Sequence, residues 1–391
     1  MGGPRAAGRA VTLAVIATVL AVPACDGGRP TREGTTVPQA GPTATVKIGF
    51  IGALTGPSAA LGTGIVAGEK LAVSQFDAVD PPVRISLDVV DTGGDPSRAR
   101  SGALRLVADR VVAVIGPTFG DEAAAADPVL EQAGIPSVTV SAADRDLAAR
   151  GWRYFHRLIP DDALQGQAIG GFLSKNLRAN TVAVLDDSVA SSRSLAVSVA
   201  EAVSGAGATV LSSDHLDARP GGIDSAVRTV MGESPQAVFF AGTAGAAARL
   251  ATGLRSAGFA GKFLVGGPGI VGYAGASGTS AAEGTYLACG CAGTDQNPDA
   301  QAFNAAYLAQ FGSGPGPYAA EAYDATNAIL QAVKSGDITP TAINGFLATV
   351  DYTGITRTVR FVPDGDWVGS TTYLYKVESG QAVQIASFGQ S

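Results

Sequence analysis

The sequence predicts an α/β protein whose strands pair in parallel sheets, arranged in two successive units along the chain. Short, continuous apolar runs recur along it, as is typical of strands that are buried on both faces. These runs alternate with longer segments whose apolar residues have helical spacing, and this alternation is typical of parallel α/β folds. The alternation occurs twice within 391 residues. That length exceeds the roughly 250 to 300 residues at which a single hydrophobic core stops growing.

The first unit opens with the apolar run VKIGFIGA at residues 46–53, which ends in a Leu-Thr-Gly-Pro turn. Asp95 and Pro96 stand directly before an amphipathic segment, as is usual where a helix begins. Gly134 follows another such segment and is expected to end that helix. The strands expected in this unit are 46–53, 85–90, 111–115 and 136–140, and the helices are 64–76, 98–109 and 122–133.

The same alternation resumes after Arg157 and then changes from residue 300 onward. Helices are expected at 163–176, 194–204, 222–231 and 244–257, and strands at 182–185, 209–212, 237–241 and 263–265. After residue 300 the pattern predicts three helices in a row and then strands or hairpins. These helices are 300–310, 318–335 and 341–349, and the strands are 357–362, 371–377 and 383–386.

The first 25 residues are typical of an export signal. Arg5 and Arg9 are the only charged residues before Asp26, and a thirteen-residue apolar run follows them at 10–22. The run ends in Val-Pro-Ala-Cys, which resembles a lipobox and predicts lipidation of Cys25 after removal of residues 1–24. The alternative is an ordinary signal peptide followed by an unmodified cysteine, and both interpretations take the chain out of the cytoplasm.

The segment after Cys25 is rich in Gly, Pro, Thr and Arg, and is expected to be a flexible tether reaching to residue 45. A lipid anchor and a tether would hold a folded domain close to a membrane surface.

Composition excludes several classes of protein. Hydrophobic residues make up 46% of the chain and charged residues 16%, which argues against intrinsic disorder. The net charge is −7 and no basic run occurs, so nucleic-acid binding is not expected. No apolar run after the first 25 residues approaches the roughly 20 residues of a membrane span. Three cysteines and two scattered histidines predict neither a disulfide scaffold nor a metal site.

Signatures of catalysis or cofactor binding are weak. Gly267, Gly269 and Gly272 match the dinucleotide-binding pattern after a predicted strand, but no helix is expected to follow and no acidic residue stands at the required distance. Asp186 and Asp187 are adjacent carboxylates at a strand end, and we expect them to be solvated or to cap a helix. The sequence therefore predicts a protein without enzymatic activity and without a cofactor.

Cys289 and Cys291 flank a single glycine. In an exported chain they could form a tight disulfide or remain two small core residues, and the sequence does not decide between these states.

Ligands of open α/β sheets bind outside the carboxyl ends of the strands. The loops that follow the predicted strands are rich in Gly, Ser, Thr and Asp, which lets backbone amides approach a small polar ligand. These loops are 54–62, 117–121, 141–144, 186–192, 242–245 and 266–269.

Five stretches in order resemble type I periplasmic binding proteins, and in particular their branched-chain amino acid-binding branch. The opening stretch of that family resembles VKIGFIGALTGPSAALGTGIVAGEKLAV, and a later strand, loop and helix resemble VVAVIGPTFGDEAAAADPVLEQAGIPSVTVSAAD. The first interdomain crossover of the family resembles YFHRLIPDDALQGQAIGGFL. The second crossover and its helices resemble AEGTYLACGC and FNAAYLAQFGSGPGPYAAEAYDATNAI. The resemblance runs from about residue 46 to 377.

The resemblance implies two doubly wound parallel-sheet lobes joined by a three-segment hinge. The hinge segments would lie near 154–160, 287–291 and 352–358. An N-terminal lobe would comprise 46–157 and 290–353, and a C-terminal lobe would comprise 158–289 and 354–391. A small ligand would bind between the lobes, which would close on it by a hinge motion.

The residues expected to contact the ligand follow from the same resemblance. They are Leu61, Thr118, Phe119, Gly120, Ala142, Asp144, Asp187, Thr243 and Pro268. Several depart from the amino acid binders, in which serine holds the ligand carboxylate where Gly120 stands here and threonine stands in place of Asp144. Asp144 could instead cap a helix beginning near Arg145, and Phe119 could pack in the core of its lobe.

The function implied is that of a monomeric lipid-anchored protein that delivers a small polar organic ligand, such as an amino acid, to the permease of an ABC importer. An alternative from another class is a sensor that uses the same clamp to signal to a partner. A third is an extracellular hydrolase that uses Asp186 or Asp187.

Overall fold

The computed structural model describes residues 44–217 and 220–389, which fall within one compact unit, Gly41–Ser391. The predicted signal peptide, the lipidation of Cys25 and the tether up to residue 43 lie outside the described residues. Within the described ranges, no helix is both long enough and apolar enough to cross a membrane.

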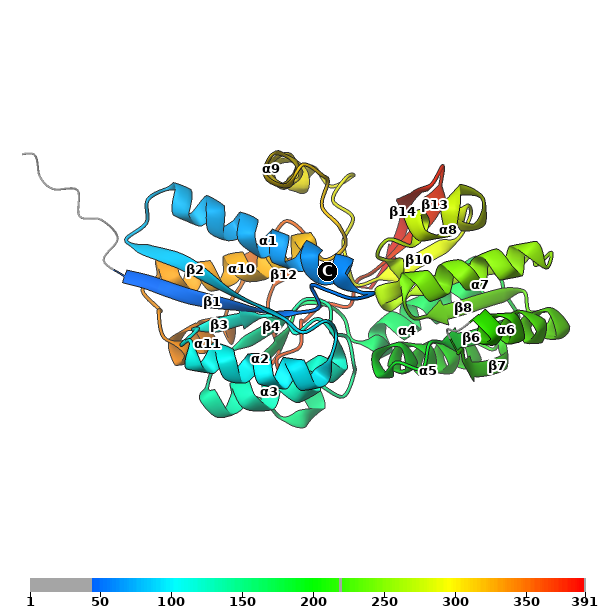
Figure 1. Cartoon of the computed structure of the whole chain (residues 1–391), viewed down its shortest axis with the longest axis horizontal. Coiled ribbons are helices and arrows are strands. Elements are labelled where there is room, and N and C mark those ends of the chain that lie inside the picture. Colours follow the sequence, from blue (N-terminus) through cyan, green and yellow to red (C-terminus); the bar gives the residue numbers. More distant parts are fainter. Residues whose placement is uncertain (1–43, 218–219, 390–391) are drawn as a thin grey trace, which may run out of the picture. The chain divides into compact units, whose positions relative to one another are not determined.

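The first lobe is built on a five-stranded parallel sheet (Figure 1). Its strands lie in the order β2-β1-β3-β4-β5, so the first strand of the chain is in the interior of the sheet. Their bounds are β1 Ala44–Gly52, β2 Val83–Asp91, β3 Ala113–Ile115, β4 Ser137–Thr139 and β5 Phe155–Arg157.

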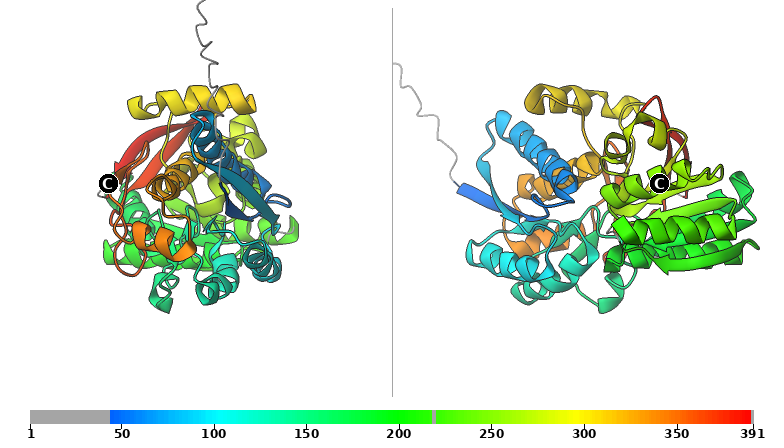
Figure 2. Two further views of the ribbon diagram at one scale, coloured as in Figure 1. Left: turned by 90° about the vertical axis from the view of Figure 1, so that its left-hand side faces the viewer. Right: turned by 45° about the vertical axis from the view of Figure 1, so that its right-hand side comes forward.

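Helices cover both faces of this sheet, as Figures 1 and 2 show. Alternation along β1 explains the two layers, because Ile48 and Phe50 pack with one set of helices and Ile51 packs with the other. Gly49 also faces the second set, where a Cβ would lie 3.0 Å from a methyl carbon of Leu106. One layer contains α1 Ala59–Ala78, α10 Ala319–Lys334 and α11 Pro340–Leu347, and the other contains α2 Pro96–Ala108 and α3 Gly120–Ala133.

The second lobe is built on a seven-stranded sheet in the order β14-β13-β10-β9-β8-β6-β7. Five of its strands are parallel, and the C-terminal hairpin β13–β14 adds two antiparallel strands at one edge. The bounds are β6 Thr181–Asp186, β7 Thr209–His215, β8 Ala237–Ala241, β9 Lys262–Gly266, β10 Tyr286–Cys289, β13 Thr372–Glu378 and β14 Gln381–Phe388.

Helices again cover both faces of the second sheet. Leu195 and Val199 pack with Phe239 on one face, whereas Leu250 packs with Phe240 on the other. The first face carries α4 Asp162–Gly171, which continues as a π-helical turn Phe172–Asn176, and α5 Ala190–Gly205. The second face carries α6 Pro220–Glu233, α7 Ala244–Ser256 and α8 Tyr273–Ala282.

The predicted class, two doubly wound α/β lobes, is confirmed, but the elements differ in three places. Helix α8 lies where we expected no helix; Gly275 and Gly278 weaken the helical signal there, and Gly278 has a φ of 68°. Strand β10 lies in a segment that we expected only to cross between the lobes. The strand predicted at 357–362 is reduced to β12, Thr358–Val359, which pairs with β11, Tyr352–Thr353.

The chain passes between the lobes after β5, after β10 and before β13. After the second passage, α9 Gln301–Phe311 packs against α1, and the β11–β12 hairpin lies beside α10. The next residues stay with the first lobe, because Asp366 pairs with Arg157 at the end of β5. We therefore propose that the third passage lies after Trp367, later than the 352–358 segment that the sequence predicted.

Candidate functional site

Gly120 at the start of α3 lines two of the cavities that lie between the lobes in the described part of the chain. The inner cavity has a volume of about 30 Å³, enough for about one or two water molecules. An organic ligand therefore needs the lining residues of the two lobes to move apart. The first lobe contributes Leu61, Phe119, Gly120, Ser141, Ala142, Ala143 and Tyr318, and the second contributes Asp162, Gln165, Ser191, Leu195 and Gly267.

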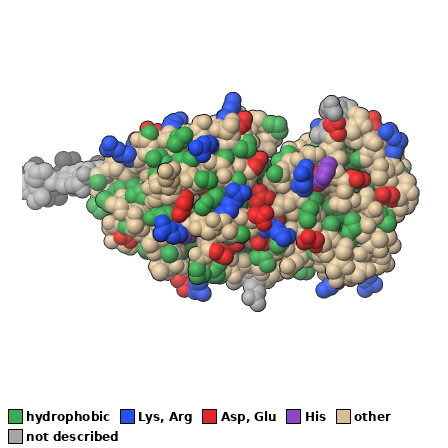
Figure 3. All heavy atoms as spheres, turned by 90° about the horizontal axis from the view of Figure 1, so that it is seen from below, with side chains coloured by type: hydrophobic (Ala, Val, Ile, Leu, Met, Phe, Trp, Pro, Cys, Tyr) green, Lys and Arg blue, Asp and Glu red, His purple; other side chains and the backbone are tan. Residues whose placement is uncertain are grey.

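The outer groove is larger, with a volume of about 560 Å³, and is lined by α3, the segment 144–150 and α5. Figure 3 views this side of the molecule and shows acidic and basic side chains gathered near the middle of it. The charged residues of the groove are Asp121, Asp144, Arg145, Asp146, Arg150, Arg193 and Glu201. One ion pair spans the groove, since Arg145 Nη1 lies 3.6 Å from Glu201 Oε2 of α5.

Asp162 is the principal polar group of the inner cavity. It is the first residue of α4, whose start is fixed by Asp161, because the Asp161 carboxylate accepts a hydrogen bond from the Leu164 amide at 2.8 Å. Asp162 is only 4% exposed, and its Oδ2 has no hydrogen-bond partner. Burial raises the pKa of its carboxyl to about 7, and the neighbouring Asp144 adds to the rise. A hydrogen bond with the Ser194 side chain opposes this rise in pKa. Oδ2 is the buried oxygen of this carboxyl that has no partner and can meet a ligand.

Asp144 lies on the other side of the same region, against the backbone at the start of α3. A Cβ built on Gly120 would collide with the Asp144 carboxylate, so the two residues fit only because position 120 is glycine. Burial raises the pKa of the Asp144 carboxyl. The predicted alternative of a helix beginning near Arg145 is wrong, because the next helical turn is Ala148–Arg150 and Leu147 stands at its N-terminal cap.

Arg157 holds this corner of the site in place. Its side chain is fully buried, and Nε and Nη2 donate to the two carboxylate oxygens of Asp366 at 2.9 and 2.8 Å. Its Nη1 donates to the backbone carbonyl of Asp144 at 2.7 Å. A paired cation therefore positions the backbone of Asp144 and leaves the Asp144 carboxylate directed elsewhere.

The structure brings four of the predicted contact residues, Leu61, Phe119, Gly120 and Ala142, into the inner cavity and Asp144 into the adjoining groove. They come from three segments, the start of α1, the start of α3 and the loop after β4. This is the convergence expected at the carboxyl ends of parallel strands.

Three predicted residues lie outside the inner cavity lining and make structural contacts. Thr118 is fully buried, and its Oγ1 accepts a hydrogen bond from the Ala53 amide at 3.1 Å. Asp187 accepts a hydrogen bond from the amide of Thr243, the residue before α7, at 2.8 Å. The side chain of Pro268 lies outside the described residues. Ligand contact by these four residues stays a prediction.

Four lining residues lie outside both the predicted contact residues and the predicted ligand-binding loops, namely Asp162, Gln165, Leu195 and Tyr318. Asp162 and Gln165 had a usable signal, because an acid three residues before a glutamine follows the first crossover and opens a helix. Gln165 is buried, and its Nε2 donates to the Pro160 carbonyl at 2.8 Å. Tyr318 gave no local signal, since it enters the cavity from the position directly before α10, far along the chain.

The environment of Asp186 differs from the one that the sequence predicted. Asp186 was expected to be solvated or to cap a helix, but it is buried and its Oδ2 lies 2.7 Å from His215 Nδ1. Its other oxygen, Oδ1, accepts from the Ser188 amide at 2.7 Å. In the part of the chain that the structure describes, no group of three or more His, Cys, Asp or Glu is arranged to hold a metal ion.

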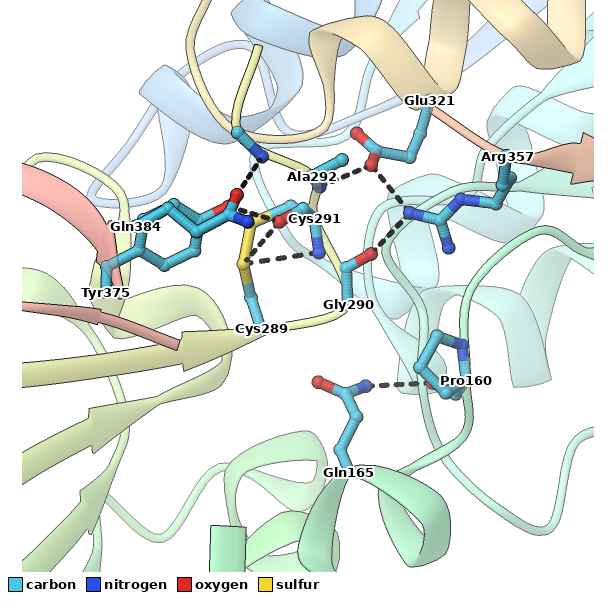
Figure 4. Close-up of a disulfide and its surroundings, with 11 residues drawn as sticks. Pro160, Gln165, Cys289, Gly290, Cys291, Ala292, Glu321, Arg357, Tyr375 and Gln384 are labelled. Carbon is cyan, nitrogen blue, oxygen red and sulfur yellow. Dashed lines mark hydrogen bonds and ion pairs between the residues drawn. A yellow bond between two sulfur atoms is a disulfide. The ribbon is translucent and has the colours of Figure 1, made fainter. Parts of the chain in front are cut away.

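Arg357 joins the crossing segments behind the cleft (Figure 4). Its Nη1 donates to the Leu158 carbonyl of the first crossing at 3.1 Å, and Nη2 donates to the Gly290 carbonyl of the second at 2.7 Å. Nη2 also lies 2.7 Å from Glu321 Oε1 in α10, and both side chains are fully buried. The guanidinium carbon lies 4.6 Å from the ring centroid of Trp367. The Arg357 guanidinium thus links the first and second crossings to the segment that contains Arg357.

A disulfide joins Cys289 and Cys291 in the second crossing, which answers the question that the sequence left open. The carbonyl of Cys291 accepts a hydrogen bond from the Tyr375 hydroxyl at 2.6 Å. Gly290 between the cysteines lies against the first crossing, where a Cβ would be 3.0 Å from Pro160 Cδ. The first and second crossings therefore pack directly on each other.

Most of the chain is similar to known proteins. A family model described as "Periplasmic binding protein" matches residues 45–382. The chain belongs to this family. Among curated proteins, it is 27% identical to the leucine-, isoleucine-, valine-, threonine- and alanine-binding protein of Pseudomonas aeruginosa, over 82% of this chain and 87% of that one. It is 28% identical to a Leu/Ile/Val-binding protein of Rhizobium johnstonii, over 87% and 94%.

Solved structures agree with the family. The isoleucine complex of the branched-chain amino acid transporter substrate-binding protein LivJ from Streptococcus pneumoniae matches with a TM-score of 0.80 and 26% identity, over 88% of this chain and 99% of that chain. The predicted resemblance to the branched-chain amino acid-binding branch is thus confirmed. Membership implies an extracytoplasmic location and solute binding, and the family is not a family of enzymes.

Proposed function

We propose that this chain is the extracytoplasmic solute-binding lipoprotein of an ABC importer. It captures a small polar organic ligand, an amino acid or a compound like one, between its lobes. The observation that carries this proposal is the buried, unpartnered Oδ2 of Asp162 in a cavity that both lobes line. An ammonium group of the ligand would supply the missing partner and would favour the charged carboxylate.

Closure of the lobes explains how such a site works. The inner cavity is too small for an organic ligand as it stands, so binding requires the lobes to open and then to close around the ligand. Leu61, Phe119 and Tyr318 come from one lobe and Leu195 from the other, and together they would enclose an apolar portion of the ligand. The named relatives support this class, since their names refer to leucine, isoleucine and valine.

The predicted lipid at Cys25 and the tether that follows would keep the protein close to a membrane permease. A closed, liganded clamp presents a surface to the permease that an open clamp lacks. The chemistry of transport then belongs to a separate ATPase, and no bond of the ligand is broken here.

Calorimetric titration of the purified protein with panels of amino acids, amino acid amides, amines, carboxylates and sugars tests the proposal. We expect a ligand with an amino group to bind and to reduce the radius of gyration in solution scattering. Asp162→Asn should weaken that binding by about tenfold or more, whereas Asp80→Asn, at a position outside both cavities whose side chain is 59% exposed, should not. Binding that is restricted to sugars, or an absence of compaction with every compound, would overturn the proposal.

A further inference from the structure

We infer that the ligand of this cleft is a small organic cation without a carboxylate group, because the protein places its own carboxylate where a ligand carboxylate would have to lie. This inference rests on the proposed function and narrows its ligand class to amines and related compounds. It is carried by the packing of Asp144 on Gly120, by the use of the α3 amides and by the unpartnered oxygen of Asp162.

The start of α3 is the natural anion site of the cleft. A helix N-terminus carries a partial positive charge and free amides, and it faces the cavity here through Phe119 and Gly120. The chain fills that site itself. The Phe119 amide donates to Glu122 Oε2 at 3.1 Å, and the Glu122 amide donates to Asp121 Oδ1 at 2.9 Å. The Asp144 carboxylate occupies the space beside the glycine. A ligand carboxylate would find the Phe119 and Glu122 amides engaged and the carboxylates of Asp121, Glu122 and Asp144 nearby.

Nearby cations do not compensate for these carboxylates. No Lys, Arg or His is among the described residues that line the inner cavity. Arg157 faces Asp162 from β5, but its guanidinium is bound to Asp366 and to the Asp144 carbonyl. The outer groove holds three arginines, of which Arg145 lies near Asp146 and Glu201. A carboxylate that enters the inner cavity would therefore meet Asp162 without a compensating cation.

The shape of the remaining lining fits an amine with a short apolar body. Phe119 and Tyr318 are aromatic, and Leu61 and Leu195 are aliphatic. Aromatic rings attract ammonium groups as well as hydrocarbon. The Ser191 hydroxyl is a further buried polar atom without a partner and can accept an ammonium hydrogen.

The test compares each amino acid with the amine that lacks only its carboxylate. Calorimetric titration at about pH 8 would use alanine with ethylamine, leucine with 3-methylbutylamine and phenylalanine with 2-phenylethylamine, together with leucinamide and 4-methylpentanoate. In at least one size class we expect the amine to bind about tenfold or more tightly than its amino acid, and 4-methylpentanoate not to bind.

Several outcomes would overturn the inference. Tighter binding of an amino acid than of its amine, or binding of 4-methylpentanoate, would overturn it and leave the proposed solute capture intact. Absence of binding by every amine would also overturn it. The proposed function fails separately, if no compound of the wider panel compacts the protein.

The pH dependence of ligand affinity gives a second test, because the affinities for amines and for carboxylates should change in opposite directions. Asp144, Asp161, Arg157 and Tyr318 are the ionisable groups around Asp162, whose carboxyl has a pKa of about 7. An amine needs this carboxyl ionised, so its affinity should fall when the pH is lowered from about 8 to about 5.5. A carboxylate ligand would bind the protonated acid, and its affinity would rise over the same interval. A rise for the best ligand would contradict the inference.

Variants separate Asp144 from general effects on folding. Asp144→Asn keeps the shape but removes the charge, and we expect the preference for amine over amino acid to shrink by about tenfold. Asp80→Asn removes a charge from an exposed position of the first lobe that lines neither cavity, and it should leave the preference unchanged. The preference is a ratio measured on one protein, so a loss of active material does not alter it. An unchanged ratio in Asp144→Asn would contradict the assigned role.

Discussion

Arg357 is the residue on which the crossings between the lobes depend most. It is fully buried, it is paired with Glu321, and it donates to carbonyls of two other segments. Removing one partner of a buried ion pair leaves an uncompensated charge, which costs about 3–5 kcal/mol. We therefore expect Arg357→Met to lower the free energy of unfolding by about that amount, measured by urea denaturation.

A double variant separates the lost charge balance from lost packing. Arg357→Met with Glu321→Met removes both charges, so it should recover part of the stability that the single variant loses. Arg360→Met breaks an exposed pair with Asp351 and should cost at most about 1 kcal/mol. A double variant that is less stable than the single one would show that the pair is not the source of the effect.

Asp127 in α3 should make stability depend on pH in an unusual direction. Its side chain is buried, and burial raises the pKa of its carboxyl to about 8. The folded state therefore holds a proton that the unfolded state releases above about pH 4. The free energy of unfolding should fall as the pH rises from about 4 to about 8, by at most about 1.4 kcal/mol per pH unit for this group.

Other buried groups also contribute to the pH dependence of the free energy of unfolding. Glu122 and Asp162, with pKa values raised to about 7 by burial, act in the same direction. His156 acts in the opposite one, because burial lowers its pKa to about 4 and acid favours its unfolded form. Asp127→Asn should flatten the curve of melting temperature against pH, whereas the exposed Asp146→Asn should not. A curve that is equally steep in Asp127→Asn would exclude this assignment.

At the scale of elements, the contact between α1 and α10 requires glycine at one position. A Cβ on Gly68 would collide with the backbone carbonyl of Ala319, and backbone cannot move aside cheaply. We expect Gly68→Ala to lower the free energy of unfolding by about 1–3 kcal/mol despite the better helix propensity of alanine. Gly345→Ala in α11 is the matched control, because no atom lies within 4 Å of its Cβ. That change should stabilise by up to about 1 kcal/mol, and urea denaturation of both variants measures the difference.

Elements were predictable where periodicity was strong and failed where glycine or length weakened it. Strand β8 is found at the predicted residues, Ala237–Ala241, because five buried apolar residues in a row have one plausible structure. Helix α8 contains two glycines and several small polar residues, so helical periodicity does not reveal it in the sequence. Strand β12 keeps only Thr358–Val359, since Asp366 and Trp367 draw the following residues back against the first lobe.

At the scale of the whole molecule, the sequence resemblance predicted the lobes and part of the cleft. Phe119 and Gly120 could be placed because they follow a recognisable strand and begin a helix. Tyr318 and Asp162 meet at the cavity although they are far apart in the chain, and only the folded arrangement joins them. The packing of the Asp144 carboxylate against Gly120 could not be predicted from the sequence either, because it depends on where that carboxylate lies in space.

Closure of the lobes could depend on the disulfide of the second crossing or on the hydrogen bonds around it, and a variant without the disulfide distinguishes the two. Cys289 and Cys291 are two residues apart, so the bond closes a very short loop and constrains the unfolded chain little. Replacing both by alanine should lower the free energy of unfolding by about 1–2 kcal/mol in urea denaturation. Closure should survive, because Arg357 and Tyr375 still hold the carbonyls of Gly290 and residue 291. Solution scattering with bound ligand should show the same compaction in both proteins. Lost compaction with intact ligand affinity would instead make the disulfide the element that transmits closure across the hinge.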